Sequence, residues 1–405
     1  MITLVVLCFV SRAASGAVPR GLSLSFALLM QQALKSLLGL VTPAIDFDRE
    51  RCLCFRAGWA EKRERRLAAA VAAAAAQERG LPKIDFTGVG QADTGSPSWE
   101  AVREQVMQAL GSYGCFEAVY DRVTPQLRGS ILEMAAEELF PLPLEAKIKN
   151  TSDKPFGGYL GQISGFDYES LAITDAPLPH GAPRFCGLLW PDGNPDFCEK
   201  AYTFSKKLGE LEEMVRRMVL ESLGVTEYHE EQSASIWYLL RFSRYGAVGD
   251  GEQEEEGERK KAGYMAHRDV NTLGIVCQLN GVDGLEVDSG DGQWIPAKPS
   301  SPTSYFVIAG DTFRAWSNGR VTAPLHRVNV GGEDTRYSVI LFSVPKDEAV
   351  IHAPAELVDE RRPTLFRPFA FGEFLRFCAT EEGMKAECKL SAYCGRAAAA
   401  EAAEA

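Results

Sequence analysis

The hydrophobic pattern of the chain changes its period near residue 233, and this change limits the folds that the sequence can form. Before it, apolar residues recur at helical spacing, as in the stripe of Phe204, Leu208 and Leu211. After it, short apolar segments alternate with turn residues, a pattern typical of strands. Helices followed by many short strands predict an α+β chain whose second half is a β-sandwich or barrel.

Three helices and a loop-rich connection are predicted in the first half. One helix begins near Trp99 with Ser98 as its expected N-cap, a second extends toward Pro141, and a third stops at Gly224. Residues 151–195 are rich in Gly and Pro without a sustained period, so we expect an ordered loop there. We expect strands at residues 81–86, 116–120, 236–242, 273–279, 285–287, 305–308, 326–330 and 337–344, and a short C-terminal helix at 371–377.

The chain divides by composition into five segments. We expect a poorly ordered extension at residues 1–80, a helical region at 81–232, a β core at 233–346 that contains a solvated charged loop at 250–261, a C-terminal segment with a helix at 347–395, and a disordered tail at 396–405. The extension partly resembles a signal peptide but lacks its positively charged start. A cytoplasmic location is therefore expected, with targeting by the extension as the alternative.

Composition argues against several kinds of partner. The formal net charge is −12, whereas nucleic-acid binding needs a basic surface, so we expect no nucleic-acid partner. No segment is apolar for long enough to span a bilayer, so we expect no membrane contact. Ten scattered cysteines do not form a disulfide framework or zinc-binding pairs. The expectation is a monomer with reduced thiols that acts on a small molecule.

Two of the five histidines stand in a pattern typical of metal ligands. His267 and Asp269 form an H-x-D triplet, predicted at the start of a strand, where residues two apart point to the same face. His326 opens another predicted strand. Two imidazoles and one carboxylate on one side of a metal leave the other side open, as in the facial triad of non-haem Fe(II) oxygenases. The alternative for each histidine alone is a surface or core residue.

A candidate carboxylate-binding pair follows ten residues after His326. Arg336 and Ser338 share one face of the last predicted strand. A guanidinium presents a planar fork that matches a carboxylate, and a hydroxyl beside it can donate a further hydrogen bond. The alternatives are a surface salt bridge for Arg336 and an edge-strand hydroxyl for Ser338.

Together these motifs resemble the Fe(II)/2-oxoglutarate-dependent dioxygenase superfamily of plants, over about residues 81–395. The likeness to one branch, the AOP-type dioxygenases of alkenyl and hydroxyalkyl glucosinolate production, is carried by local signatures at residues 190–195, 280–287, 309–311, 315–318 and 391–395. Dioxygenases that oxidise auxin are related to this branch. The sequence departs from the branch at Val270, where Lys is common, and at Arg268, where Thr is common.

The resemblance implies a fold and a set of ligands. The fold would be a double-stranded β-helix (jelly-roll) core with flanking helices. The implied Fe(II) and catalytic ligands are His267, Asp269 and His326, and the implied 2-oxoglutarate ligands are Tyr245, Arg336 and Ser338. The enzyme would use O2, with ascorbate as the reductant that maintains the iron, and would release succinate and CO2.

The resemblance also implies that a small specialised metabolite is hydroxylated or desaturated. Auxin (indole-3-acetate) oxidation is the alternative within this chemistry, and it would need a second cation for the substrate carboxylate. The rival from another class is a non-catalytic metabolite- or hormone-binding protein on the same fold, which has no need of a complete triad. Phe342 is a candidate substrate wall or a core residue, and the aromatic stretch at 158–168 is a candidate lid or ordinary packing.

Overall fold

The computed structural model describes residues 80–153, 157–163, 167–246, 262–330 and 334–395. The expected N-terminal extension, apart from Gly80, lies outside the described residues, as do the C-terminal tail and the whole charged loop at 250–261. The described residues form a mixed helix-and-sheet fold, which confirms the α+β prediction. No helix among them combines the length and the apolar composition that crossing a bilayer requires.

The larger of the two main sheets has seven strands, in the order β1-β2-β9-β6-β11-β4-β3. Its strands are β1 (Lys83–Asp85), β2 (Cys115–Val119), β3 (Tyr168–Thr174), β4 (Ile236–Tyr245), β6 (Leu273–Gln278), β9 (Ser304–Ala309) and β11 (Arg336–Pro345). Only β1 and β2 pair in parallel, and the other neighbours are antiparallel. Strand β11 lies between β4 and β6 along most of its length, so these three strands form a continuous surface.

A second, four-stranded sheet covers one face of the large sheet. Its order is β5-β10-β7-β8, from β5 (Ala262–His267), β7 (Leu285–Asp288), β8 (Trp294–Pro296) and β10 (His326–Val330). A buried apolar cluster joins the sheets, with Val276 and Phe306 from the large sheet and Leu285 and Val287 from the small one. The two sheets therefore enclose an interior space, and side chains of alternate residues on β4, β6 and β11 face it.

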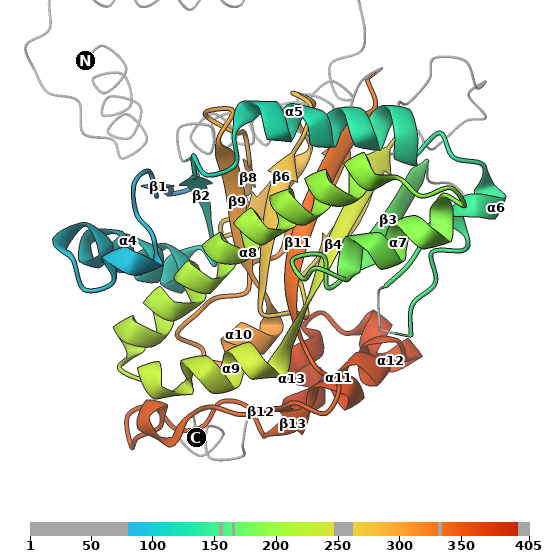
Figure 1. The fold of residues 1–405 in the computed structure, drawn as a ribbon. Helices are drawn as coiled ribbons and strands as arrows, with labels where there is room; N and C mark the ends of the chain where they lie inside the picture. The colour runs from blue at the N-terminus through green and yellow to red at the C-terminus, as the bar shows by residue number, and fades with distance from the viewer. Residues whose placement is uncertain (1–79, 154–156, 164–166, 247–261, 331–333, 396–405) are drawn as a thin grey trace, which may run out of the picture. The chain divides into compact units, whose positions relative to one another are not determined.

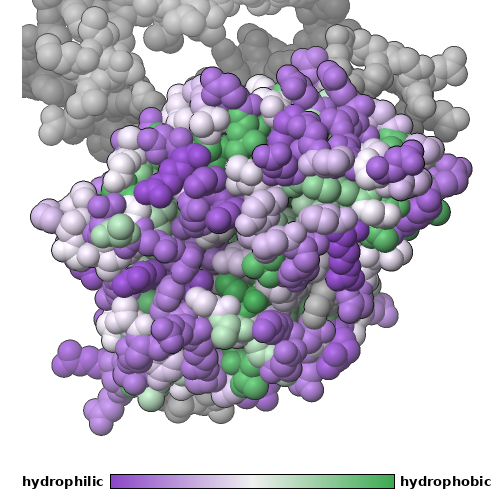
Figure 2. All heavy atoms as spheres, in the orientation of Figure 1, coloured by the Kyte–Doolittle hydropathy of each residue, from purple (hydrophilic) through white to green (hydrophobic). Residues whose placement is uncertain are grey.

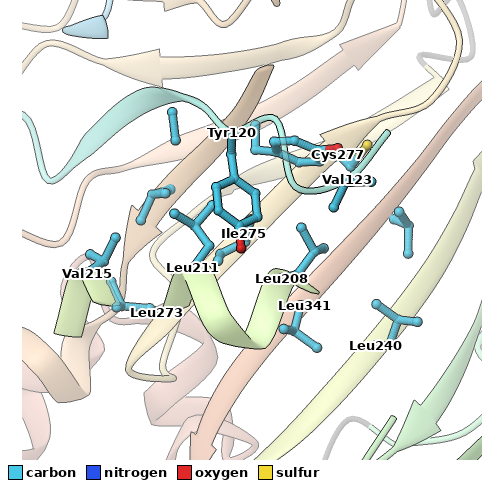
Figure 3. Packing of buried hydrophobic residues seen from close by; sticks show 14 of the residues in the cluster. Tyr120, Val123, Leu208, Leu211, Val215, Leu240, Leu273, Ile275, Cys277 and Leu341 are labelled. Atoms are coloured by element: carbon cyan, nitrogen blue, oxygen red, sulfur yellow. The ribbon is translucent and has the colours of Figure 1, made fainter. Parts of the chain in front are cut away.

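Helix α8 (Pro195–Leu223) covers the opposite face of the large sheet (Figure 1). Its start is fixed by Asn194, whose side chain accepts a hydrogen bond from the N–H of Phe197 at 3.0 Å. It ends, as predicted, at Gly224, whose φ of +73° favours glycine. Figure 3 shows its apolar stripe, including Leu208 and Leu211, seated on residues of β4, β6 and β11.

The remaining helices surround this core. They are α4 (Pro97–Ser112), α5 (Pro125–Glu133), which continues as a π-helical turn (Met134–Leu139), α6 (Leu144–Lys147), α7 (Gly181–Leu189), α9 (His229–Ser235) and α10 (Asp311–Trp316). The N-cap predicted for the first helix was wrong by two residues. The cap is Ser96, whose hydroxyl accepts from the N–H of Trp99, because Pro97 already occupies the first helical position.

The loop-rich connection predicted at 151–195 was also partly wrong, because β3 and α7 lie within it. Strand β3 is buried on both faces over most of its length and therefore lacks an alternating pattern. Helix α7 contains Gly181, Pro183 and Gly187, which favour loops in a sequence. Gly181 is needed there because an added Cβ would stand 2.2 Å from the carbonyl oxygen of Asp175.

The C-terminal segment closes one end of the sheets. The predicted helix is confirmed as α11 (Phe371–Cys378), and it is followed by α12 (Glu381–Lys385) and α13 (Lys389–Cys394), after the small hairpin of β12 (Val350–Ile351) and β13 (Phe369–Ala370). Phe371 and Phe374 pack in a cluster with Trp237 and Leu239 of β4. On the face seen in Figure 2, hydrophilic side chains predominate and hydrophobic ones gather only in small patches.

Candidate metal centre

The three predicted metal ligands meet at one end of the small sheet. His267 is the last residue of β5 and His326 the first of β10, and the two are direct partners in the antiparallel register. Their Nε2 atoms lie 3.5 Å and 3.8 Å, respectively, from Oδ1 of Asp269. One ligand atom of each residue lies within 4.8 Å of the other two. The structure thus brings together all three residues.

The reason predicted for this convergence was wrong. The H-x-D triplet does not start a strand, because β5 ends at His267 and Asp269 lies in the following loop. That loop is anchored to the start of α10. The N–H of Asp311 donates to the carbonyl of Asp269 at 2.7 Å, and the hydroxyl of Thr312 donates to the carbonyl of Val270 at 2.6 Å. The carboxylate is therefore positioned by a loop held against a helix, and strand alternation plays no part.

Backbone carbonyls set the orientation of both imidazole rings. Nδ1 of His267 lies 2.8 Å from the carbonyl oxygen of Met265, and Nδ1 of His326 lies 3.3 Å from that of Pro324. A carbonyl oxygen can only accept, so each Nδ1 carries the proton. Both Nε2 atoms then keep a lone pair directed toward Asp269. Metal-bound histidines in proteins are commonly oriented in this way.

The charge states of the cluster suit a divalent cation. Burial, and then the neighbouring His267, lower the pKa of His326 to about 4, so this ring is neutral at pH 7. Burial by itself raises the pKa of Asp269, but His326 and His267 more than offset this and hold that pKa below its ordinary value. Two imidazoles and one carboxylate are the donor set of a non-haem Fe(II) site with open coordination positions. The residues present therefore fit Fe(II).

Arg336 and Ser338 lie on β11, on the face that looks toward the small sheet. The guanidinium of Arg336 is fully buried, and Nη1 donates to the hydroxyl of Ser338 at 3.2 Å. Its Nη2 donates to Oε1 of Gln278 at 2.9 Å, while its Nε is buried without a hydrogen-bond partner. These two partners are neutral. A buried guanidinium with an unsatisfied donor fits the carboxylate of a bound dicarboxylic acid.

Tyr245 stands beside this guanidinium, where the sequence placed it. It is the direct register partner of Arg336 on β4, and the guanidinium carbon lies 5.1 Å from the centre of its ring. Burial lowers the pKa of Arg336 and raises the pKa of Tyr245, so the phenol stays protonated and can donate. Gly284 leaves room on the other side, since an added Cβ would stand 3.1 Å from Cδ of Arg336.

Gln278 is a site residue that the sequence analysis missed. It is the register partner of Ser338 on β6, and its Nε2 donates to the carbonyl of Ala297 at 2.7 Å. That bond fixes the amide so that its oxygen faces Arg336. The sequence contained one indication of this role. Gln278 is the one polar side chain in the strand predicted at 273–279, and the structure shows that this strand is buried.

Arg336, Ser338 and Tyr245 together form the expected 2-oxoglutarate clamp. A row of aromatic rings connects this clamp to the metal ligands, and the sequence analysis did not predict the row. The ring of Tyr168 lies 5.0 Å from that of Tyr245 and 5.9 Å from that of Tyr264. The ring of Tyr264 lies in turn 4.8 Å from that of His267. Tyr168 was expected in a lid or in ordinary packing, and it forms an interior wall of the site on β3.

A cavity of about 430 Å³ opens between this wall and the C-terminal helices. His267, Tyr168 and Tyr264 line its inner side. Its outer part includes exposed apolar side chains, with Met265 76% and Met384 66% accessible, together with Ile163. These three residues are called the apolar rim below. A volume of this size holds a small organic molecule.

Phe342 packs at the edge of the C-terminal apolar cluster, as its interpretation as a core residue predicted, and it is not among the residues that line the cavity. Its register partner on β6 is Gly274. A Cβ added at Gly274 would stand 3.3 Å from the ring of Phe342 and 3.6 Å from Oδ2 of Asp269. The glycine therefore lets the ring of Phe342 and the carboxylate of Asp269 approach the backbone of β6 closely.

Sequence models of two known families match the chain. A sequence model of the 2OG-Fe(II) oxygenase superfamily matches residues 237–345, which include all six predicted ligands. A second family model, of the non-haem dioxygenase in morphine synthesis N-terminal region, matches residues 81–170.

Individual relatives agree with these matches. The chain is 43% identical over 314 residues to a probable 2-oxoglutarate-dependent dioxygenase AOP1.2 of Arabidopsis thaliana, covering 77% of this chain and 95% of the relative. Among solved structures, dioxygenase for auxin oxidation 1 of Arabidopsis thaliana with 2-oxoglutarate aligns with a TM-score of 0.59 and 26% identity, over 70% of this chain and 99% of that one. The dioxygenase for auxin oxidation in rice aligns with a TM-score of 0.59 and 28% identity, over 74% and 94%.

Proposed function

The chain belongs to the 2OG-Fe(II) oxygenase superfamily and is a 2-oxoglutarate-dependent dioxygenase, and from that premise we propose that it hydroxylates or desaturates a small specialised metabolite. The reaction consumes O2 and 2-oxoglutarate and releases succinate and CO2. The observation that carries the proposal is the convergence of His267, Asp269 and His326, together with a row of aromatic rings that leads from His267 to the buried guanidinium of Arg336. A protein that only binds a metabolite gains nothing from holding these groups together.

Each group has a distinct task in this proposal. His267, Asp269 and His326 hold Fe(II), and the bound metal with its cosubstrate supplies the activation of O2 and the oxidising power. Arg336 and Ser338 bind the far carboxylate of 2-oxoglutarate. The phenol of Tyr245 donates a further hydrogen bond to the same carboxylate, which fixes the direction of the dicarboxylate along β11.

The protein contributes mainly by placing groups. The carbonyls of Met265 and Pro324 keep both Nε2 atoms directed at one point, and the N–H of Asp311 holds the loop that carries the carboxylate. The rings of Tyr168 and Tyr264 line the cavity next to His267. A fixed geometry removes much of the entropic cost of bringing the reacting carbon to the metal.

We also propose that the two sheets are the halves of a double-stranded β-helix, or jelly roll. Two apolar clusters that each draw residues from both sheets support it. In this description residues 81–232 form the helical N-terminal region, 233–346 the catalytic core and 347–395 a C-terminal segment that walls the cavity. A monomeric, cytoplasmic enzyme without nucleic-acid or membrane partners remains the expectation, and light scattering of the full chain tests its oligomeric state.

Auxin oxidation is the second candidate function. The likeness to the Arabidopsis and rice dioxygenases for auxin oxidation favours it, because both align over most of this chain. A cavity of about 430 Å³ with aromatic walls also has room for an indole ring. The two candidates share their cofactor chemistry and differ only in the prime substrate.

Succinate release tests the proposal. The full chain is given Fe(II), ascorbate, 2-oxoglutarate and O2, with and without a panel of small metabolites that includes indole-3-acetate. Asp269→Ala removes the carboxylate ligand, and Asp121→Ala, an exposed position outside the site, is the matched control. We expect succinate that requires Fe(II), that is lost in Asp269→Ala and that is retained in Asp121→Ala.

The outcomes separate the candidates. Acceleration of succinate release by indole-3-acetate above all other compounds would favour auxin oxidation, and acceleration by another metabolite would identify the substrate class. If the wild-type protein binds neither Fe(II) nor 2-oxoglutarate, the proposed enzymatic function is contradicted. That result would favour the hypothesis of a non-catalytic metabolite-binding protein. Retention of full activity in Asp269→Ala would contradict the assignment of the metal ligands.

A further inference from the structure

A second cavity, of about 310 Å³, lies at the opposite end of strands β4 and β11 from the 2-oxoglutarate clamp. Ile236 and Pro345, which pair at that end of the two strands, are on its lining. The clamp pair of Tyr245 and Arg336 is nine residues away along each strand, which is about 30 Å at about 3.3 Å per residue. Among the described residues, none lines both this cavity and the one beside His267. The two cavities are therefore separate.

The second cavity has an apolar interior and an exposed mouth. Helices α9 and α10 and strand β12 contribute to its lining, and Figure 1 shows these three elements close together at one end of the large sheet. Phe313 and Ile351, which are both buried, form part of its inner surface. Glu231 and His352, which are both exposed, lie at its mouth. A volume of this size holds a small organic molecule.

Two aromatic rings stand together on the lining. The ring centres of Tyr228 and Trp316 lie 5.9 Å apart, and the planes of the rings meet at 75°. The hydroxyl of Tyr228 donates to Oε2 of Glu356 at 3.2 Å, which fixes the orientation of the phenol. The faces of tryptophan and tyrosine rings attract organic cations within about 6 Å of the ring centre. Two rings set nearly at a right angle resemble part of an aromatic cage.

The charges around these rings also favour a cation. Glu231 lies on the lining, and no cation among the described residues pairs with it. Burial, and then Glu356, Glu227 and Glu231, raise the pKa of Tyr228, so three carboxylates act on the phenol together. His352 is the one basic side chain on the lining, and it is exposed. A recess with mainly negative charges concentrates cations and disfavours anions.

Gln232 adds an acceptor without a partner. It lies on the lining, and its Oε1 is buried without a hydrogen bond to any described residue. Such an acceptor is costly to leave unsatisfied, and it forms a hydrogen bond if its side chain turns toward a donor in the cavity. An ammonium group has three donors and no acceptor. It therefore matches the carboxylate of Glu231 and the amide oxygen of Gln232 together.

The inner wall of the second cavity adjoins the loop that carries Asp269. Thr272 and Thr312 both line the cavity. The hydroxyl of Thr312 donates to the carbonyl of Val270 at 2.6 Å, and the N–H of Gly310 donates to the carbonyl of Thr272 at 3.0 Å. A ligand that rests against the two threonines thus contacts groups that hold the metal-binding loop in place.

We propose that the second cavity binds a small primary amine with an apolar body, and that its binding is coupled to the binding of Fe(II). The ammonium group meets Glu231 and Gln232 beside the two aromatic rings, and the apolar body extends inward toward Phe313. Thr312 links the occupied cavity to the loop of Asp269. The inference goes beyond the proposed function, because it does not depend on the identity of the prime substrate.

A packing gap without a ligand is the competing explanation. A recess between helix ends can hold water alone. If it takes up organic molecules at all, it does so by apolar contact and binds an amine and an alcohol of the same shape equally well. An ammonium site prefers the amine, and its preference depends on Glu231 and Gln232.

The test compares two probes that share one skeleton and differ in charge, namely 2-phenylethylamine and 2-phenylethanol. Both are titrated by calorimetry into the metal-free full chain at pH 8, where the amine is charged and an ordinary exposed imidazole is neutral. The variants are Glu231→Gln and Gln232→Leu. Glu230→Gln is the matched control, because Glu230 is exposed on the same helix but does not line the cavity.

We expect the wild type to bind the amine about tenfold or more tighter than the alcohol, as a hydrogen bond to a charged group provides. Glu231→Gln and Gln232→Leu should each lower this preference by about threefold or more, and Glu230→Gln should keep it within about twofold. Equal affinity for the two probes, no binding of the amine, or a preference that survives Glu231→Gln overturns the inference. Since Glu231 is exposed, its replacement leaves the fold intact.

The coupling has its own measurement. The amine titration is repeated anaerobically with saturating Fe(II), and because coupling is reciprocal we expect the amine affinity to change by about fivefold or more. Thr312→Val, which removes the hydroxyl bonded to Val270, should reduce this change to less than about twofold. Thr87→Val, at an exposed position, should keep it. An amine affinity that does not respond to Fe(II), or an equal response in Thr312→Val, overturns the coupling.

Failure of the inference and failure of the proposed function are separable. Binding of the amine to the metal-free chain requires neither 2-oxoglutarate nor turnover, and succinate release is measured on the same wild-type preparation. A protein that releases succinate but does not discriminate amine from alcohol keeps its function and loses the second site. A protein that prefers the amine but releases no succinate with any metabolite keeps the second site and loses the proposed function.

Discussion

His267 and His326 are direct partners across the β5–β10 pair, and the centres of their rings lie 4.3 Å apart. Two imidazoles at this distance cannot both carry a proton without strong repulsion, because like charges a few ångströms apart disfavour the charged form. Burial, and then the neighbouring His267, lower the pKa of His326 to about 4, so that ring is available as a metal ligand at pH 7. The register of the antiparallel pair β5–β10 thus sets the distance between the two histidine ligands.

Replacing His326 by Gln should remove most of the Fe(II) affinity. The variant loses one of three ligands, and since changes of second-sphere groups alone cost about 10- to 100-fold in metal affinity, we expect a loss of about 100-fold or more. Anaerobic titration with Fe(II) measures it. His352→Gln, at an exposed histidine outside the site, should bind like the wild type, and a similar loss in both variants would contradict the assignment.

Replacing Gln278 by Leu should weaken 2-oxoglutarate binding without impairing turnover at saturation. The amide oxygen holds Nη2 of Arg336 at 2.9 Å, and a hydrogen bond to a charged group contributes about 1.5–3 kcal/mol, or about 10- to 100-fold. Steady-state kinetics should show a higher KM for 2-oxoglutarate and a kcat within about twofold of the wild type. Gln91→Leu, at an exposed position, controls for the loss of an amide. A fall in kcat alone would argue against a positioning role.

Replacing Gly274 by Ala should narrow the site next to Asp269. The added Cβ would stand 3.3 Å from Phe342 and 3.6 Å from the carboxylate, which is tight toward the ring. We expect an unchanged KM for 2-oxoglutarate and a lower kcat/KM for bulky prime substrates, measured with the metabolite identified by succinate release. Gly129→Ala, in an open stretch of α5, should leave both unchanged, and equal effects in the two variants would refute the steric explanation.

The stability of the metal-free protein should decrease as the pH falls below about 6.5. Burial, and then the positive charge of Arg216, lower the pKa of His229, so the unfolded chain takes up this proton at a higher pH than the folded one. The unfolded state then binds more protons in this range, and the free energy of unfolding falls with falling pH. Urea denaturation between pH 5 and pH 7.5 measures the slope.

The control for this prediction is a pair of histidine variants. His229→Gln should have a flatter dependence than the wild type, whereas His352→Gln should keep the wild-type slope. Identical slopes in all three proteins would show that His229 does not contribute.

The ligand residues could be predicted from the sequence because their spacing reflects the order of strands. His326 opens the strand predicted at 326–330, whereas β5, which ends at His267, was not predicted, and His267 was identified from the H-x-D triplet alone. Arg336 and Ser338 followed from simple alternation on β11. In these cases the chemistry depends on local periodicity, which a single sequence reveals.

The features that could not be predicted depend on contacts between distant segments. Asp269 is positioned by Asp311, and Gln278 is positioned by Ala297, and neither contact leaves a local pattern. Helix α7 was missed because its stability comes from packing against α8 and β3, which overrides the unfavourable Gly and Pro in its sequence.

The apolar rim of the cavity has a consequence for how the substrate preference of this protein can change. Its three residues come from three unrelated segments, namely Ile163 before β3, Met265 on the edge strand β5 and Met384 on α12, and all three are exposed. Exposed side chains contribute little to the free energy of folding, so they can be exchanged at almost no cost in stability. Mutations there can accumulate while the metal ligands and the clamp stay intact. A gene duplicate could therefore acquire a new substrate in single steps, each of which leaves a working oxidant in place.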